Sequence, residues 1–157
     1  MMYRLKIGII ILVITFGLGG MPLAIRAEEL PKPAIQQKFI DFYGQGLEKF
    51  KGKNYQEAVG KFTKAIEANP TGELAYYFRG ISRSYLTDNQ GAIQDFDRVL
   101  EINPSFSLVY YFRGLAYIET GNKKPAISDL QNAANFYKQQ GDIETYTAIM
   151  EKIKSLQ

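Results

Sequence analysis

Apolar and aromatic residues recur along most of the chain at the spacing of amphipathic helices. Between residues 39 and 50, apolar side chains return every three or four positions, as on one face of a helix: Phe39, Phe42, Tyr43, Leu47 and Phe50. A polar turn at 51–54 follows, and then a second apolar face of Ala58, Phe62, Ala65 and Ile66. Asn54 and Glu57 resemble a capping box that would begin this second helix. We expect the helix to end before Pro70, because proline lacks an amide N–H and clashes with the preceding turn.

The helix pair repeats with a period of 34 residues. Three classes of residue keep this step: Gly46, Gly80 and Gly114; Ala58, Ala92 and Ala126; and Pro70 and Pro104, each preceded by asparagine. The second and third units also share Tyr-Tyr-Phe-Arg-Gly, at 76–80 and 110–114. The period defines three units, 39–72, 73–106 and 107–140. Their small residues predict a close approach of the two helices, with large aromatic side chains filling the gaps beside them.

The segment 141–157 predicts one further amphipathic helix. Its apolar residues form a single stripe: Ile143, Tyr146, Ile149, Met150, Ile153 and Leu156. The third unit has no following unit to cover its apolar face, so we expect this helix to cap the array. The alternative is a free helix that binds a partner.

The first 27 residues have the order of a secretory signal. Arg4 and Lys6 precede an uncharged run from 7 to 25, and a polar shift follows at Ala27. We expect cleavage after Ala27. An uncleaved, single N-terminal membrane anchor is the alternative, because the uncharged run is close to the length that spans a bilayer. Either way, the remainder is expected outside the cytoplasm, in a periplasm, a lumen or the medium. Residues 28–38 are predicted to be a linker and the start of the first helix.

Composition and charge narrow the possible functions. The chain has no cysteine and no histidine, which removes disulfides and the commonest metal ligands and general base. Three of the 19 basic residues lie before Glu28, whereas all 16 acidic residues lie at or after it. Without the leader, the formal net charge would therefore be zero, and nucleic-acid binding loses its electrostatic basis. No catalytic constellation is present, so we expect no enzymatic activity, no cofactor and no metal.

The pattern within each unit resembles that of tetratricopeptide repeat proteins. Phe42, Tyr76 and Tyr110 stand at the first aromatic position, and the pairs Ala58 with Phe62 and Ala92 with Phe96 match the signature of the second helix. The leucine before the repeat glycine is replaced by Gln45, Arg79 and Arg113, and the third unit has Leu130 for phenylalanine and Lys138 for the closing proline. The resemblance implies an all-α fold, an α-solenoid of antiparallel helix pairs.

Two arginines and two aspartates occur together within this pattern. The second and third units carry Arg79 with Asp95 and Arg113 with Asp129, whereas the first unit has Gln45 and Lys61 at the same two positions. We expect structural ion pairs, Arg79–Asp95 and Arg113–Asp129, across a helix hairpin or between adjacent repeats. Anion binding by the arginines is the alternative.

The resemblance also implies a concave groove along the first helices of the repeats. The expected groove residues are Tyr43, Leu47, Tyr77, Ile81, Tyr85, Tyr111 and Leu115. Some relatives bind terminal carboxylates of chaperones there through lysine, asparagine and arginine side chains. This chain has Tyr43, Leu47 and Phe112 at such positions, so an apolar or aromatic ligand is expected instead. The opposing interpretation is that part of this row is buried.

These observations predict an exported scaffold or adaptor that binds a protein or peptide segment in the groove, with assembly of a membrane complex as one setting. No nucleic-acid partner is expected, and membrane contact only through residues 1–27. The alternative function is a self-associating structural repeat protein, a homo-oligomer, whose groove is filled by its own copy or by its C-terminal helix.

Overall fold

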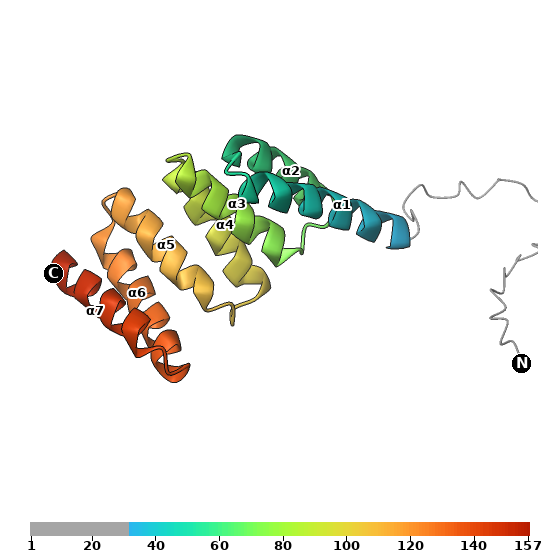
Figure 1. Cartoon of the computed structure of the whole chain (residues 1–157). Helices are drawn as coiled ribbons and strands as arrows, with labels where there is room; N and C mark the ends of the chain where they lie inside the picture. The colour runs from blue at the N-terminus through green and yellow to red at the C-terminus, as the bar shows by residue number, and fades with distance from the viewer. Residues whose placement is uncertain (1–31) are drawn as a thin grey trace, which may run out of the picture.

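The sequence folds into helices that are stacked in chain order, as a computed structural model that describes residues 32–157 shows (Figure 1). The described part contains seven helices and no strand: α1 (Lys32–Lys51), α2 (Tyr55–Ala68), α3 (Glu73–Tyr85), α4 (Asn89–Ile102), α5 (Leu108–Glu119), α6 (Lys123–Gln139) and α7 (Ile143–Leu156). The predicted all-α solenoid is therefore confirmed. The predicted signal or anchor at 1–27 lies outside the described residues.

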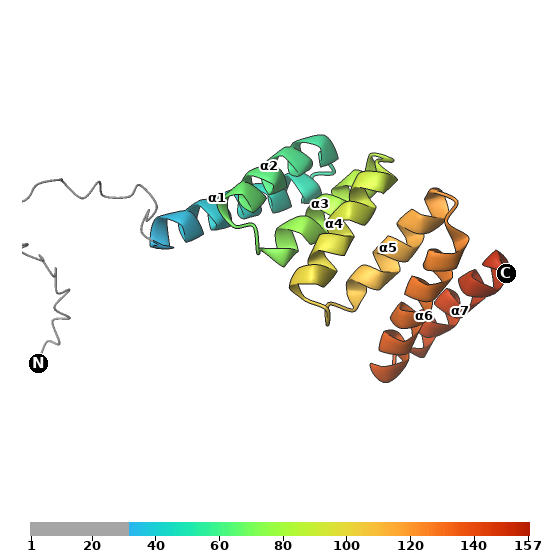
Figure 2. The same ribbon diagram turned by 180° about the vertical axis from the view of Figure 1, so that it is seen from behind.

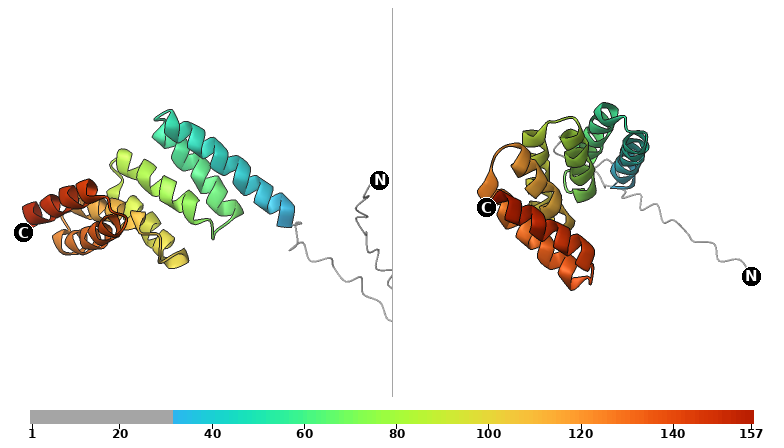
Figure 3. Two further views of the ribbon diagram at one scale, coloured as in Figure 1. Left: turned by 60° about the horizontal axis from the view of Figure 1, so that its bottom comes forward. Right: turned by 60° about the vertical axis from the view of Figure 1, so that its left-hand side comes forward.

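Each helix packs on the helices before and after it in the sequence, and α1 and α7 lie at opposite ends of the stack (Figures 1 and 2). The first helices of neighbouring repeats also touch, α1 with α3 and α3 with α5. The axes of successive pairs turn progressively along the stack (Figure 3). This arrangement leaves one row of first helices, α1, α3 and α5, side by side.

The capping box predicted at the start of α2 is not formed. Asn54 precedes α2, but its side chain makes no capping hydrogen bond, and Glu57 pairs with Lys49. The capping box predicted for α2 is therefore wrong, because Glu57 has a cationic neighbour on α1. Real side-chain caps occur at other helices: Asp88 accepts from the Gly91 amide at 3.0 Å, and Asp142 accepts from the Thr145 amide at 3.0 Å.

The two helices of a repeat approach closely at a glycine that recurs every 34 residues. Phe62, Phe96 and Leu130 occupy equivalent positions and are 0% exposed. A Cβ placed on Gly80 would lie 2.7 Å from the Phe96 ring, and one on Gly114 would lie 3.1 Å from Leu130. Glycine is thus required for the ring of the second helix to lie directly against the backbone of the first. The predicted roles of the small and aromatic positions are confirmed.

The last helix covers the end of the array. α7 packs on α6, and Ile149 and Ile153 are 2% and 3% exposed beside Leu130 and the alanines of α6. Ile143 and Met150, which belong to the same apolar stripe, remain exposed. The helix therefore caps the third repeat and does not occupy the space between the earlier first helices.

Within residues 32–157, no helix combines the length and the apolarity needed to cross a membrane.

Candidate functional site

The fifth-position tyrosines of the first two repeats, Tyr43 and Tyr77, pack against aromatic rings of the repeat that follows. The Tyr43 ring stacks on Phe39 at 5.6 Å and meets Phe78 of the next repeat at 6.1 Å. The Tyr77 ring meets two rings edge-on, Phe106 at 5.1 Å and Phe112 of the next repeat at 5.7 Å. All distances are between ring centroids.

This packing partly buries the tyrosines and raises the pKa of two of their hydroxyl groups. Desolvation, with a smaller contribution from Tyr137, raises the pKa of Tyr77 to about 12, and desolvation also raises the pKa of Tyr43. Tyr43, Tyr77, Tyr111, Leu47 and Leu115 are half-buried, and Ile81 is 7% exposed. Part of the row expected to face a ligand therefore also packs against the rest of the array. Which of these residues contact a ligand stays a prediction.

Tyr85 differs from the other groove tyrosines because the residue is 62% exposed. It stacks on Tyr55 with the ring centroids 4.3 Å apart and the planes within 7°, and Phe50 meets it edge-on. Tyr55 begins α2 and was not among the residues predicted from the repeat pattern. Its contact joins the start of one repeat's second helix to the end of the next repeat's first helix. The stack holds an aromatic face in place at the surface.

Two adjoining hollows lie between the last turns of α3 and α5. One, of about 230 Å³, is lined by Ile81, Ser84, Tyr85, Phe112 and Leu115. The other, of about 300 Å³, is lined by Ser84, Thr87, Asn89, Phe112, Leu115, Ala116 and Glu119. Because they share Ser84, Phe112 and Leu115, we describe them together as the α3–α5 cleft. Sequence reasoning missed Thr87 and Asn89, which come from the loop and the second helix of the repeat.

The cleft brings together three of the predicted groove residues, Ile81, Tyr85 and Leu115. The other four are distributed along the array. Tyr111 lines a separate hollow of about 310 Å³ beside Glu144, Ile149 and Lys152 of α7. Tyr43, Leu47 and Tyr77 line neither half of the cleft.

A further hollow lies at the open end of the array. It measures about 430 Å³ and is lined by Ile35, Gln36, Phe39 and Ile40 of α1 with Ala68 and Asn69 of α2. Ile40 is 51% exposed there. This face belongs to the first helix, which has no preceding helix in the described chain to pack against.

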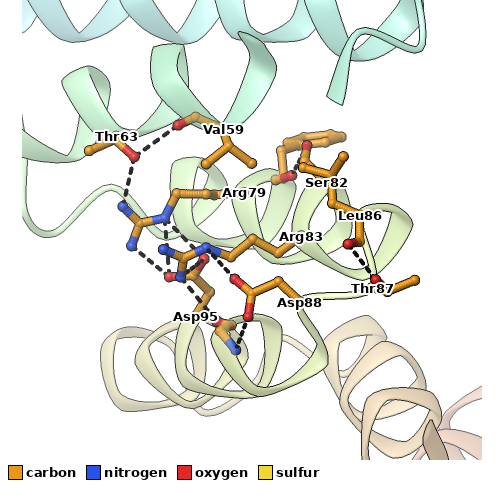
Figure 4. Close-up of polar contacts among 11 residues, drawn as sticks. Val59, Thr63, Arg79, Ser82, Arg83, Leu86, Thr87, Asp88 and Asp95 are labelled. Atoms are coloured by element: carbon orange, nitrogen blue, oxygen red, sulfur yellow. Dashed lines mark hydrogen bonds and ion pairs between the residues drawn. The ribbon is translucent and has the colours of Figure 1, made fainter. Parts of the chain in front are cut away.

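The arginine at the seventh position of the second repeat is held by a buried carboxylate (Figure 4). Arg79 donates from Nε to Asp95 Oδ2 at 3.0 Å and from Nη2 to Oδ1 at 2.6 Å. Arg83 donates to the same carboxylate at 2.9 Å. The third donor of Arg79, Nη1, reaches the Thr63 hydroxyl of the preceding repeat at 3.1 Å. Asp95 is 2% exposed.

The third repeat has a similar arrangement, in which a second carboxylate takes the place of the second arginine. Arg113 donates to both oxygens of Asp129, at 2.7 and 2.8 Å, and to Asp97 of the preceding repeat at 2.6 Å. Hydrogen bonding to Asp129 raises the pKa of Arg113 further above its already high value, against the opposing effect of desolvation. In the first repeat, Lys61 donates instead to Gln45 at 2.7 Å.

The guanidinium groups of Arg79 and Arg113 are thus already paired with carboxylates of the chain itself. The sequence left open whether each pair forms within a hairpin or between repeats. Each aspartate lies in the same hairpin as its arginine, and a second partner of the arginine comes from the preceding repeat. The Arg79–Asp95 and Arg113–Asp129 pairs therefore tie the two helices of one repeat together, and the contacts with Thr63 and Asp97 join neighbouring repeats. This geometry argues against an anion site at these arginines. Among residues 32–157, no group of three or more His, Cys, Asp or Glu side chains is arranged to hold a metal ion.

Comparison with known proteins agrees with this architecture. Residues 108–134, which span α5 and most of α6, match the sequence model of the tetratricopeptide repeat. No curated protein matches the sequence.

Three solved structures illustrate the likeness in fold. The TPR domain of Arabidopsis OM64 has a TM-score of 0.70 at 23% identity, over 77% of this chain and 98% of that one. The first TPR of Spaghetti (RPAP3), bound to the HSP90 peptide SRMEEVD, has a TM-score of 0.68 at 23% identity, over 76% and 92%. PcrH, in complex with the chaperone binding region of PopD, has a TM-score of 0.70 at 11% identity, over 77% and 92%. The described chain therefore has the tetratricopeptide repeat fold, and its third repeat carries the sequence pattern of that family.

Proposed function

We propose that this chain is a non-enzymatic protein-interaction module, which binds a peptide or protein segment in the α3–α5 cleft. The observation that carries the proposal is an open hollow between two first helices, walled by Ile81, Tyr85, Phe112 and Leu115. Large apolar side chains at a surface hollow are typical of recognition sites. Solved neighbours of this fold support the proposal, since RPAP3 is bound to an HSP90 peptide and PcrH to a segment of PopD.

A selection of random linear peptides displayed on phage tests this function on the full-length protein. We expect enriched peptides to bind Tyr85→Ala about tenfold more weakly, because truncating an aromatic anchor at a binding surface costs more than about 1 kcal/mol. Met150→Ala is the matched control, since Met150 is also exposed, at 40%, but lies on the terminal helix. Circular dichroism should show both variants to be folded.

Two outcomes of the selection would contradict the proposal. Peptides that bind the wild type and Tyr85→Ala equally would move the site away from the cleft. Absence of any enriched peptide would argue against a module for linear segments.

We further propose that the chain acts outside the cytoplasm, as a scaffold or adaptor in the assembly of a membrane complex. The support for the location is the order of basic, apolar and small residues in 1–27. The intact mass of the protein purified from its own cells tests it. We expect a species that begins at Glu28, and a species that begins at Met1 would contradict cleavage.

A further inference from the structure

The two halves of the α3–α5 cleft differ in polarity. The smaller half is apolar, with Ser84 the one small polar side chain among Ile81, Tyr85, Phe112 and Leu115. The larger half adds Thr87, Asn89 and Glu119. A ligand that fits both halves must therefore carry an apolar group next to a polar one.

The size of the apolar half favours a single side chain as its occupant. Its volume is about 230 Å³, whereas pockets for small-molecule ligands are commonly about 300–1,000 Å³. Its walls are held in place: Tyr85 is stacked on Tyr55, and Phe112 lies between Tyr77 and Tyr111 with centroid distances of 5.7 and 5.5 Å. Preformed walls of this kind reduce the entropy that is lost when a peptide side chain binds.

Among the described residues, the polar half carries one acidic side chain and no basic side chain. Glu119 is the one charged residue that lines the cleft in the described chain, and it is exposed. The cleft also lies at the last turns of α3 and α5, which end at Tyr85 and Glu119. The C-terminal end of a helix carries a partial negative charge and favours cations.

The basic side chain near the cleft, Arg83, is already paired with carboxylates of the chain itself. Arg83 lies in the last turn of α3 but donates to Asp95, to the Gly91 carbonyl and toward Asp88. No lysine or arginine is among the residues of the described chain that form the cleft wall. An acidic peptide, such as the SRMEEVD peptide bound by RPAP3, would place its carboxylates against Glu119.

We infer that the α3–α5 cleft binds a linear peptide segment in which an apolar side chain stands next to a lysine or arginine. The apolar side chain occupies the space between Tyr85, Phe112 and Leu115. The cation lies by Glu119 and the carbonyl ends of α3 and α5. This inference rests on the proposed function and specifies the chemistry of its ligand.

A matched series of fluorescein-labelled peptides tests the inference by fluorescence anisotropy with the full-length protein. Each peptide has one leucine in a neutral serine and glycine background, with lysine, serine or glutamate at the two flanking positions. We expect the lysine peptide to bind about threefold to fivefold more tightly than the serine peptide, the effect of one partly exposed charge pair, and the glutamate peptide to bind most weakly. Raising the salt concentration should reduce the difference.

Two charge-neutralising variants locate the effect. Glu119→Gln should bring the lysine and serine peptides close to equal affinity, with little change for the serine peptide. Lys51→Gln is the control: Lys51 stands at the same repeat position two units earlier and lines neither half of the cleft. It should leave the lysine preference unchanged. A lysine peptide with serine in place of its leucine should bind at least about tenfold more weakly, through loss of its anchor.

Several results would overturn the inference. Equal affinity for all three flanks would do so while leaving the peptide-binding function intact, and so would a preference for glutamate. Unchanged binding of the peptide without leucine would indicate a merely electrostatic surface. Failure of all synthetic peptides to bind overturns the ligand chemistry, and the phage selection then decides whether the module binds linear segments at all. A dimer by light scattering that dissociates in Tyr85→Ala would assign the cleft to a second copy of the chain.

Discussion

Replacing Phe96 by alanine is expected to lower the free energy of unfolding by about 3–5 kcal/mol, the range for removing a buried aromatic ring. Phe96 is 0% exposed, lies against Gly80 and packs near Phe112 with the ring centroids 6.3 Å apart. The ring therefore joins α4 to the first helices of two repeats. Urea unfolding followed by circular dichroism measures the change. Tyr85→Ala is the matched control, because the same kind of truncation at a residue that is 62% exposed should cost less than about 1 kcal/mol.

A second substitution checks that the contact with Gly80 accounts for part of this effect. Gly80→Ala alone should destabilise by about 1–3 kcal/mol through overpacking, since its Cβ would lie 2.7 Å from the Phe96 ring. In the Phe96→Ala background, the same methyl group enters the vacated space and should cost much less. Simple addition of the two single effects would show that Gly80 and Phe96 do not interact as the structure has them.

Replacing Asp95 by asparagine is expected to lower the free energy of unfolding by about 3 kcal/mol, as for removal of one partner of a buried ion pair. The Asp95 carboxylate accepts from Arg79 and Arg83 and is 2% exposed. The substitution leaves the largely buried guanidinium group of Arg79 without its anionic partner and removes one of the two carboxylates that Arg83 faces. Thermal and urea unfolding measure the loss.

The first repeat supplies the matched control for this prediction. Lys61 stands at the position of Asp95, and its partner Gln45 is neutral and exposed. Lys61→Met should therefore change stability by less than about 1 kcal/mol. If Asp95→Asn melts as the wild type does, the carboxylate is not a structural joint, and the anion-binding interpretation of Arg79 regains support.

The arginine–aspartate pairs show what the 34-residue period predicts and what it does not. Arg79 and Asp95 occur together and are absent together within the 34-residue units, and that covariation was enough to predict their pairing. The third partner of each arginine was not predictable. Thr63 and Asp97 occupy equivalent positions in successive repeats, but a threonine and an aspartate share no pattern that marks them as partners of one guanidinium group.

The candidate site was predicted less completely than the fold. The repeat position placed Tyr43, Tyr77 and Tyr85 on one side of the array, yet only Tyr85 is strongly exposed. Phe78 and Phe112 of the following repeats cover the first two. The charge of the cleft likewise depends on where Glu119 ends α5 relative to Tyr85 at the end of α3.

The amino-acid sequence was sufficient to predict the helix pairs, their 34-residue period, the glycine and phenylalanine contacts and the arginine–aspartate pairs. These features are local or periodic: they depend on residues that lie on one helix face, or one hairpin apart, and such geometry follows from 3.6 residues per turn. Tertiary structure alone decided which tyrosines are packed, how Tyr55 supports Tyr85, and that α3 and α5 leave a cleft with Glu119 at its edge. Exposure and cavity shape depend on side chains from different repeats and on the angle between those repeats, which the spacing of residues along one chain does not specify.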